Sequence, residues 1–252
     1  MGNMEVVIRT AMNIPTVRVN RVEFLRKELN GKVSDDIIEL AIKDGTKKAG
    51  VPVELVEKLA KNAINSKALL TVTASFLSGL PGGLVGLLGG SSADIIQYYA
   101  NFLNLAQKLM YLYGYGDIND LTTSQEEIMI VVMGLASGVE VANAFLKKVL
   151  TENAGKWAKA IVLKNTSKNV FKVVSEKVLA TLGRKSATRI AEEQATRIAG
   201  KAVPVVRGVI SGAISAVTFK PMAKKLNKSF REFYTYIPKN NEVIYIEDFI
   251  DL

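Results

Sequence analysis

The stretch "SFLSGLPGGLVGLLGGSSADIIQYY", residues 75–99, holds six glycines and one proline among apolar residues, within a charge-free run from residue 68 to residue 93. A phosphate-binding loop needs GxxxxGK[ST], or GxGxxG between a strand and a helix, and the stretch matches neither. Three alternatives remain: a hairpin of two buried helices bent at Pro-Gly-Gly 81–83, a hairpin that packs inside the protein or dips into a bilayer, and a full membrane span. The broken middle of the run favours the buried hairpin and disfavours the full span, which needs about 20 predominantly apolar residues.

The residues after this stretch predict a strongly apolar helix from Ser91 to about Tyr113. Its polar residues form one narrow stripe: Gln97, Asn101, Asn104, Lys108 and Tyr111. A helix this apolar must lie in the centre of the core or face lipid. The amides in the stripe are either a small solvent face, which is the simpler interpretation, or the lining of a polar slot or of a lipid-headgroup site.

Most of the remaining chain also has helical periodicity. Apolar residues recur at intervals of three and four in segments 34–50, 51–70 and 170–178. The only strand-like piece is "EVIYI" at 242–246. The sequence therefore predicts an all-α protein, a compact multi-helix bundle with glycine-rich apolar helices and an extended C-terminal tail.

Glycines at intervals of four recur in the apolar segments. They are Gly82, Gly86, Gly90, Gly134, Gly138, Gly208 and Gly212. On a helix, this spacing leaves one face without side chains, so that two backbones can approach closely. We expect these seven glycines to lie at helix–helix contacts.

The composition removes most of the common catalytic groups. The chain has no cysteine and no histidine, which excludes disulfides, thiol catalysis, Ser–His pairs and HExxH metal sites. Asp94 and Glu140 are the only acids that border or interrupt the apolar segments. A helix cap explains Asp94 and a solvent-facing edge explains Glu140 better than acid–base chemistry does. We expect no enzyme activity, no metal and no cofactor.

Positive charge is concentrated in the second half of the chain. The net charge is +9, and residues 147–201 alone hold 13 Lys or Arg and 4 Asp or Glu. Downstream lies a basic amphipathic segment whose predicted lipid-binding cations are Lys220, Lys224, Lys225, Lys228 and Arg231. Its apolar face is predicted to hold Met222, Leu226, Phe230 and Phe233. Such a helix suits an anionic membrane surface, and an ordinary amphipathic surface helix explains it equally well.

Three segments resemble the EcsC family of bacterial proteins. The most specific is "GLPGGLVGLLGGSSADIIQYYANFLNLAQKLMYLYGYGDI" at 79–118, and "VNRVEFLRKEL" at 19–29 and "KAVPVVRGVISGAISAVTFKPMAKKL" at 201–226 resemble flanking parts. The match spans roughly residues 18–231 in the family's order. This chain has Ser-Ser-Ala-Asp at 91–94 where the family more often has a proline before Ala-Asp, which keeps the capping aspartate but not the proline.

The resemblance implies an all-helical, membrane-associated protein and supplies no catalytic residues. It divides the chain into an N-terminal extension (1–17), a single EcsC-like helical domain (18–236) and an acidic C-terminal tail (237–252). The N-terminus lacks the long apolar core of a secretory signal, so we expect a cytoplasmic protein, peripheral at the inner face of the cell membrane.

The leading functional hypothesis is a non-enzymatic helical protein that associates peripherally with anionic membrane or binds a lipid ligand. The alternative is a soluble cytoplasmic interaction module that binds another protein, with its acidic tail as one contact. An enzyme that uses only Asp, Glu, Lys or Tyr ranks lowest. Nucleic acid is disfavoured because the basic half lacks the interleaved aromatic residues and motifs of nucleic-acid binders.

Overall fold

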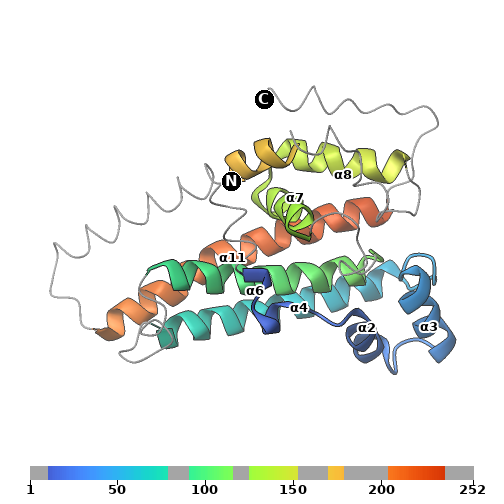
Figure 1. The fold of residues 1–252 in the computed structure, drawn as a ribbon. Coiled ribbons are helices and arrows are strands. Elements are labelled where there is room, and N and C mark those ends of the chain that lie inside the picture. Colours follow the sequence, from blue (N-terminus) through green and yellow to red (C-terminus); the bar gives the residue numbers. More distant parts are fainter. Residues whose placement is uncertain (1–10, 79–90, 116–124, 153–169, 179–203, 236–252) are drawn as a thin grey trace.

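The computed structural model describes residues 11–78, 91–115, 125–152, 170–178 and 204–235 (Figure 1). Its elements are η1 (Pro15–Val17), α2 (Arg21–Leu29), α3 (Asp35–Asp44), α4 (Val53–Ser78), α6 (Ser91–Leu112), α7 (Gln125–Ser137), α8 (Glu140–Glu152) and α11 (Pro204–Thr235). Residues 170–178 are helical as well. These ranges contain no strand, so the all-α fold class is confirmed for them. The tail and most of the glycine-rich stretch lie outside the described residues.

Helix α11 runs through the middle of the bundle and packs against α4, α6, α7 and α8 (Figure 1). Its most extensive contact is with α4, which runs in the opposite direction. Helix α6 runs parallel to α11: near its start the Tyr98 hydroxyl donates to the Met222 sulfur, and just past its end the Tyr113 hydroxyl donates to Asn227. Helices α7 and α8 lie on the side of α11 that faces away from α4 (Figure 1).

Most of the second half of α6 is buried. Its fully buried residues are Phe102, Leu103, Leu105, Ala106, Gln107, Leu109, Met110, Tyr111 and Leu112. Because consecutive residues are 100° apart around the axis, they cover all of the helix except a strip that contains the half-buried Lys108. Of the two environments that the sequence allows for this helix, its second half therefore occupies the centre of the core.

Two amides of α6, Asn104 of the polar stripe and Gln107 outside it, bind the backbone that precedes α2. The Gln107 side chain accepts a hydrogen bond from the Val19 N–H (3.1 Å) and donates one to the Val17 carbonyl (2.9 Å). Asn104 donates to the same carbonyl (3.3 Å) and is 7% exposed. The interpretation of Asn104 as part of a solvent face is therefore wrong, because its amide is used inside the protein.

The described part of the predicted N-terminal extension belongs to the core. Ala11, Met12 and Val17 are all less than 5% exposed and join the same apolar cluster as the helices. Asn20 then caps α2 by accepting a hydrogen bond from the Glu23 N–H (3.1 Å). The core thus extends upstream of the boundary that was expected at residues 17 and 18.

A buried arginine joins α2 to the ends of two other helices. Arg21, 7% exposed, donates to the carbonyls of Ala41 (3.0 Å) and Ile42 in the last turn of α3, and to the Tyr115 carbonyl (3.3 Å) beyond α6. Carbonyls at helix C-termini lack partners within the helix and carry partial negative charge. The guanidinium therefore supplies both donors and a compensating positive charge at this junction.

Two of the seven glycines of the GxxxG pattern can be assessed in detail. A Cβ placed on Gly134 would lie 2.6 Å from Val174 Cγ1 and 2.8 Å from Ala142 Cβ, so α7 approaches these neighbours at a distance that only glycine allows. Gly138 has a φ of +78° and follows the last residue of α7. Glycine is favoured there because the chain leaves the helix in a left-handed conformation. An added Cβ would lie 3.3 Å from the Lys225 Nζ of α11, and the expected packing role of Gly138 stays a prediction.

The other glycines of this pattern lie outside what can be described. Gly82, Gly86 and Gly90 are not among the described residues. Gly208 and Gly212 lie within α11, as expected for helical glycines, but in the part of α11 where only the backbone is described. The predicted close contacts at these five positions stay predictions.

Candidate functional site

The C-terminal half of α11 turns its apolar face toward the core. Met222, Leu226 and Phe230 are at most 2% exposed, and Phe233 is half-buried against the same cluster. The periodicity of the sequence predicts this face correctly. Because the protein itself occupies the face, the described part of α11 presents its cations outward.

Two of the five predicted lipid-binding cations have carboxylate partners. Arg231 forms an ion pair with Glu57 near the start of α4. Lys228 lies 3.8 Å from Glu232, one turn later on α11 itself. Their charges are therefore partly balanced within the protein.

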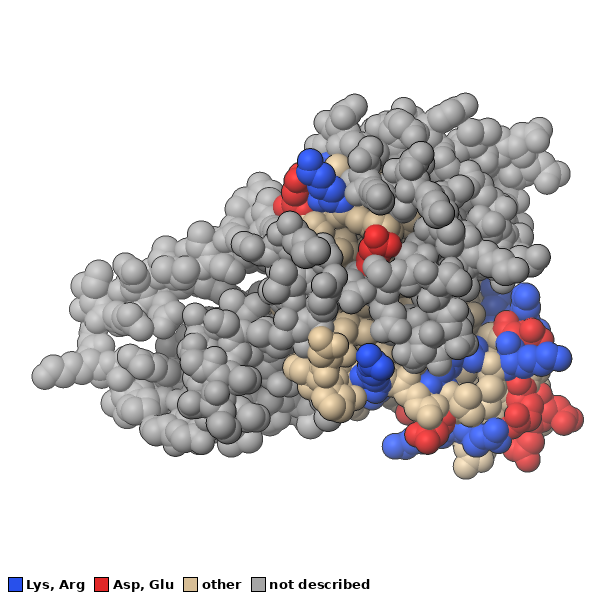
Figure 2. Space-filling model, in the orientation of Figure 1, with Lys and Arg blue, Asp and Glu red and all other residues tan. Residues whose placement is uncertain are grey.

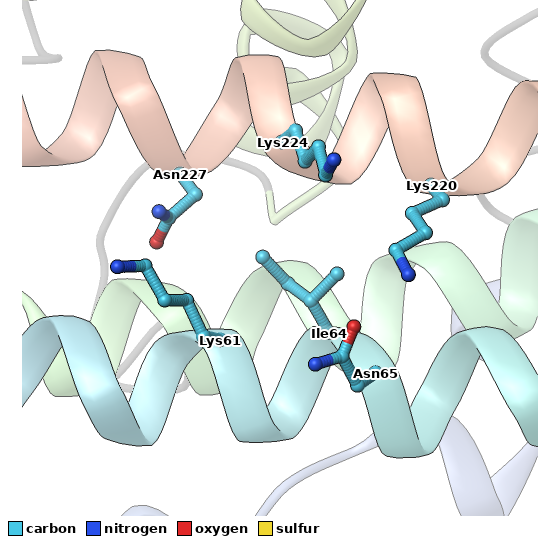
Figure 3. A pocket seen from close by; sticks show the side chains of 6 residues that line it. All are labelled: Lys61, Ile64, Asn65, Lys220, Lys224 and Asn227. Carbon is cyan, nitrogen blue, oxygen red and sulfur yellow. The ribbon is translucent and has the colours of Figure 1, made fainter.

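The other three cations separate onto two sides of α11. The Lys225 ammonium lies beside Gly138 at the end of α7, 3.3 Å from where a Cβ of that glycine would be. Lys220 and Lys224 lie on the side that faces α4 (Figure 3). All five residues still lie within about 140° of one another around α11, opposite its buried face, because consecutive residues are about 100° apart. Whether this face meets lipid stays a prediction.

Lys220 and Lys224 border a groove of about 440 Å³ between α4 and α11 (Figure 3). The groove is lined by Lys61, Ile64 and Asn65 of α4 and by Lys220, Lys224 and Asn227 of α11. The groove falls within the range of small-molecule sites, about 300–1,000 Å³. Three ammonium groups, two amides and one apolar side chain line it, so its chemistry suits an anion that carries some apolar surface.

Glu57 lies beside one end of this groove. Its side chain is 19% exposed and is shared by Arg231 and by Lys61, whose Nζ lies 3.8 Å from the carboxylate. Two cations therefore share this one carboxylate. Within the described ranges, Lys220 and Lys224 have no carboxylate within 4.0 Å, so the groove keeps an excess of positive charge.

Tyr113 fixes the orientation of the amide in the groove. Its hydroxyl donates to Asn227 Oδ1 (2.9 Å), which leaves the Nδ2 donor on the opposite side of the amide. Burial and the nearby Glu57 carboxylate raise the pKa of the Tyr113 phenol above its usual value. The phenol therefore stays protonated at neutral pH and keeps Asn227 in this orientation.

The charged surface at the α2–α3 end of the molecule has a different pattern. Figure 2 shows Lys and Arg intermixed there with Asp and Glu. One example is Arg26, which forms an exposed ion pair with Glu39 across α2 and α3 (2.6 Å). A surface of alternating sign attracts no particular ion, whereas the groove concentrates one sign of charge.

The remaining sequence-based candidates add no second site. Glu140 is exposed at the first residue of α8, as a solvent-facing edge predicts, and the Asp94 side chain is not described. The described residues contain no group of acids that could hold a metal ion. Among the described residues, no helix combines the length and the apolar content that a membrane span requires.

Sequence reasoning missed half of the groove. Lys61 and Asn65 are four residues apart, which places them on one face of α4, and Lys220, Lys224 and Asn227 follow the same periodicity on α11. These two stripes are visible in the sequence. That they face each other is not, because it depends on how two helices that are distant in the chain pack together.

No family model, characterised protein or solved structure matches this chain. The resemblance to the EcsC family therefore stays a prediction that rests on the residues quoted above.

Proposed function

We propose that this protein is a binding protein, not an enzyme, and that it associates peripherally with anionic lipid at the inner face of the cell membrane. The observation that supports the proposal is that Lys61, Lys220 and Lys224, from two helices, line one groove whose lining contains no carboxylate. In such an association, a group of lysine ammonium groups on the protein would meet the phosphate headgroups of the membrane.

The binding would be electrostatic in the described part of the protein. Each cation near an anionic membrane surface contributes about 1 kcal/mol. The apolar side of α11 packs into the core, so Phe230 and its neighbours add no insertion energy in this conformation. Salt should therefore weaken the association strongly, because added ions screen exposed charges.

Vesicle flotation tests the proposal. The protein should float with vesicles of phosphatidylcholine and phosphatidylglycerol, but not with phosphatidylcholine alone, and high salt should release it. The double variant Lys220→Gln/Lys224→Gln should bind about 30-fold more weakly, which corresponds to about 2 kcal/mol for two cations.

The matched control is Lys225→Gln/Lys228→Gln, which removes the same charge from the same helix outside the groove. It should weaken binding by less than about fivefold, since one of its lysines already pairs with Glu232. Equal losses in the two double variants would assign binding to the whole helix and not to the groove. Equal flotation with neutral and anionic vesicles would contradict the recognition of anionic lipid. Flotation with neither would contradict the lipid function and favour the protein-interaction alternative.

A further inference from the structure

The charges of the groove between α4 and α11 are spread along its length. Lys61 lies at the end beside Glu57, 3.8 Å from that carboxylate, and Lys220 and Lys224 lie farther along the groove (Figure 3). Within the described ranges, these last two lysines have no carboxylate partner. Ammonium groups spaced along a groove suit an extended acidic segment better than one compact anion, because several carboxylates can then each meet a cation.

The tail of the chain supplies an acidic segment. Residues 242–252, "EVIYIEDFIDL", hold four acids and no lysine or arginine. Phe249 and Ile250 lie between Asp248 and Asp251, so acidic and apolar side chains are interspersed. The lining of the groove includes the complementary groups, three ammonium groups and one apolar side chain. The segment therefore matches the groove in both charge and polarity.

The end of α11 places this segment within reach of the groove. Helix α11 ends at Thr235, near the start of α4, where the Tyr234 hydroxyl donates to the Val51 carbonyl (3.1 Å). Lys220 lies about 22 Å back along the axis of α11, since each helical residue advances by about 1.5 Å. Glu247 follows Thr235 by 12 residues, and an extended chain of that length spans about 40 Å. The acids of the segment can therefore reach the whole groove.

The covalent connection makes even a weak contact effective. A tethered ligand meets its site at an effective concentration on the order of millimolar, so modest affinity is enough for it to occupy the site. The intermixed charges of the α2–α3 surface offer an acidic segment no comparable attraction.

We propose that residues 242–252 dock in the groove between α4 and α11, with their carboxylates facing Lys61, Lys220 and Lys224. The contact is intramolecular and autoinhibitory, because the segment occupies the groove in competition with anionic lipid. The effect on lipid rests on the proposed function, whereas the contact itself can be measured without lipid.

Disulfide trapping in the full chain tests the contact. The chain has no cysteine, so two introduced cysteines report on one pair of positions. Under mild oxidation, Asn65→Cys/Ile250→Cys should form an intramolecular disulfide about tenfold faster than Ser66→Cys/Ile250→Cys. Asn65 lines the groove, whereas Ser66 is exposed on the same helix about 100° further around its axis. Non-reducing electrophoresis and mass spectrometry measure the two rates.

The lysines of the groove should be needed for this disulfide. Adding Lys220→Gln/Lys224→Gln to the Asn65→Cys/Ile250→Cys pair should slow its formation about tenfold, because two of the attracting charges are lost. Equal rates for the pairs with Asn65→Cys and Ser66→Cys would overturn the contact, since a segment without a docking site meets both sides of α4 alike. A disulfide between two chains would assign the groove to the segment of a second copy and overturn the intramolecular contact.

Removing the carboxylates should release the groove for lipid. In the full chain, Glu247→Gln/Asp248→Asn/Asp251→Asn should raise partitioning into vesicles that contain phosphatidylglycerol about tenfold over the parent, because the tethered competitor is weakened. Flotation measures the partitioning, and circular dichroism melting checks that the variant is folded.

The matched control is Asp35→Asn/Asp36→Asn/Asp44→Asn, which makes the same change in net charge at exposed positions of α3. It should raise partitioning by less than about threefold, since it changes only the overall charge. Equal gains in the two triple variants would overturn autoinhibition.

The two assays also distinguish this inference from the proposed function. A disulfide that forms preferentially in the groove, with no flotation of any variant, would support the docking and overturn the lipid function. Flotation of the parent with anionic vesicles, together with equal disulfide rates on the two sides of α4, would overturn the docking and leave peripheral association standing.

Discussion

The junction of α2, α3 and α6 and the groove between α4 and α11 contain similar polar side chains in opposite situations. At the junction, Arg21 and Gln107 are 7% and 0% exposed, and both bind backbone groups. In the groove, Lys220 and Lys224 are exposed and have no carboxylate partner among the described residues. A polar group whose partner is supplied by the fold is structural, whereas converging groups without a partner are available to a ligand.

The physical reason for the difference is hydration. Burying a charged group without a partner is strongly unfavourable, and three carbonyls that receive hydrogen bonds from Arg21 offset this cost. An exposed lysine keeps its water, and its position therefore tolerates the absence of a protein partner. The two regions should respond to substitution in opposite ways, one through stability and the other through binding.

The largest effect is expected at the junction. Arg21→Met should lower the free energy of unfolding by about 3 kcal/mol, because the carbonyls of Ile42 and Tyr115 lose the guanidinium donor and Ala41 keeps only the Gly45 N–H. Arg26→Met on the same helix removes only an exposed ion pair with Glu39 and should lower it by less than about 1 kcal/mol. Chemical denaturation measures both. Equal losses would mean that the guanidinium at the junction is not a structural tie.

An intermediate effect on stability is expected at Gly134, where the close contact with Val174 and Ala142 involves no polar group. Alanine is a better helix former than glycine by about 1 kcal/mol, but its Cβ would lie 2.6 Å from Val174, and overpacking costs about 1–3 kcal/mol. We expect Gly134→Ala to destabilise the protein by about 1 kcal/mol.

The clash can be tested with a second substitution. Combining Gly134→Ala with Val174→Ala should cost less than the sum of the two single changes, because the shortened side chain relieves the contact. Thermal melting of the three variants measures this coupling. Additive effects would show that these two residues do not share a close contact.

The smallest effect on stability is expected in the groove. Lys220→Gln/Lys224→Gln should change the free energy of unfolding by less than about 0.5 kcal/mol, although it weakens lipid binding strongly, because exposed charges contribute little to folding. Denaturation of this variant beside Arg21→Met gives the direct comparison. A loss above about 1 kcal/mol would make these lysines structural and break the distinction between the two regions.

Much of the fold follows from local patterns. The spacing of Met222, Leu226 and Phe230 predicts the buried face of α11, and the scarcity of charge in α6 predicts that it is central or faces lipid. These predictions succeed because a helix sorts side chains by an interval of 3.6 residues that the sequence displays directly.

Some residues have surroundings that their own segment does not display. The surroundings of Asn104 in the polar stripe, Gly138 at the end of α7 and Val17 upstream of α2 are set by neighbours outside their own helix or by backbone conformation. Asn104 resembles a surface residue until its partner, the backbone before α2, is known. A pattern of polarity records that a side chain needs water or a hydrogen bond, but not which of the two it has.

The sequence by itself determined the helices, their apolar faces and the cations of α11, because helix formation and amphipathicity depend on residues within a few positions of one another. Only the tertiary structure decided that Lys220 and Lys224 face Lys61 and Asn65 across a groove, while Lys225 and Lys228 lie elsewhere. It also decided that Tyr113 orients Asn227. These relations depend on how α4, α6 and α11 pack against one another. The burial of apolar surface drives this packing, but no short segment of sequence shows which polar faces of two helices will then lie opposite each other.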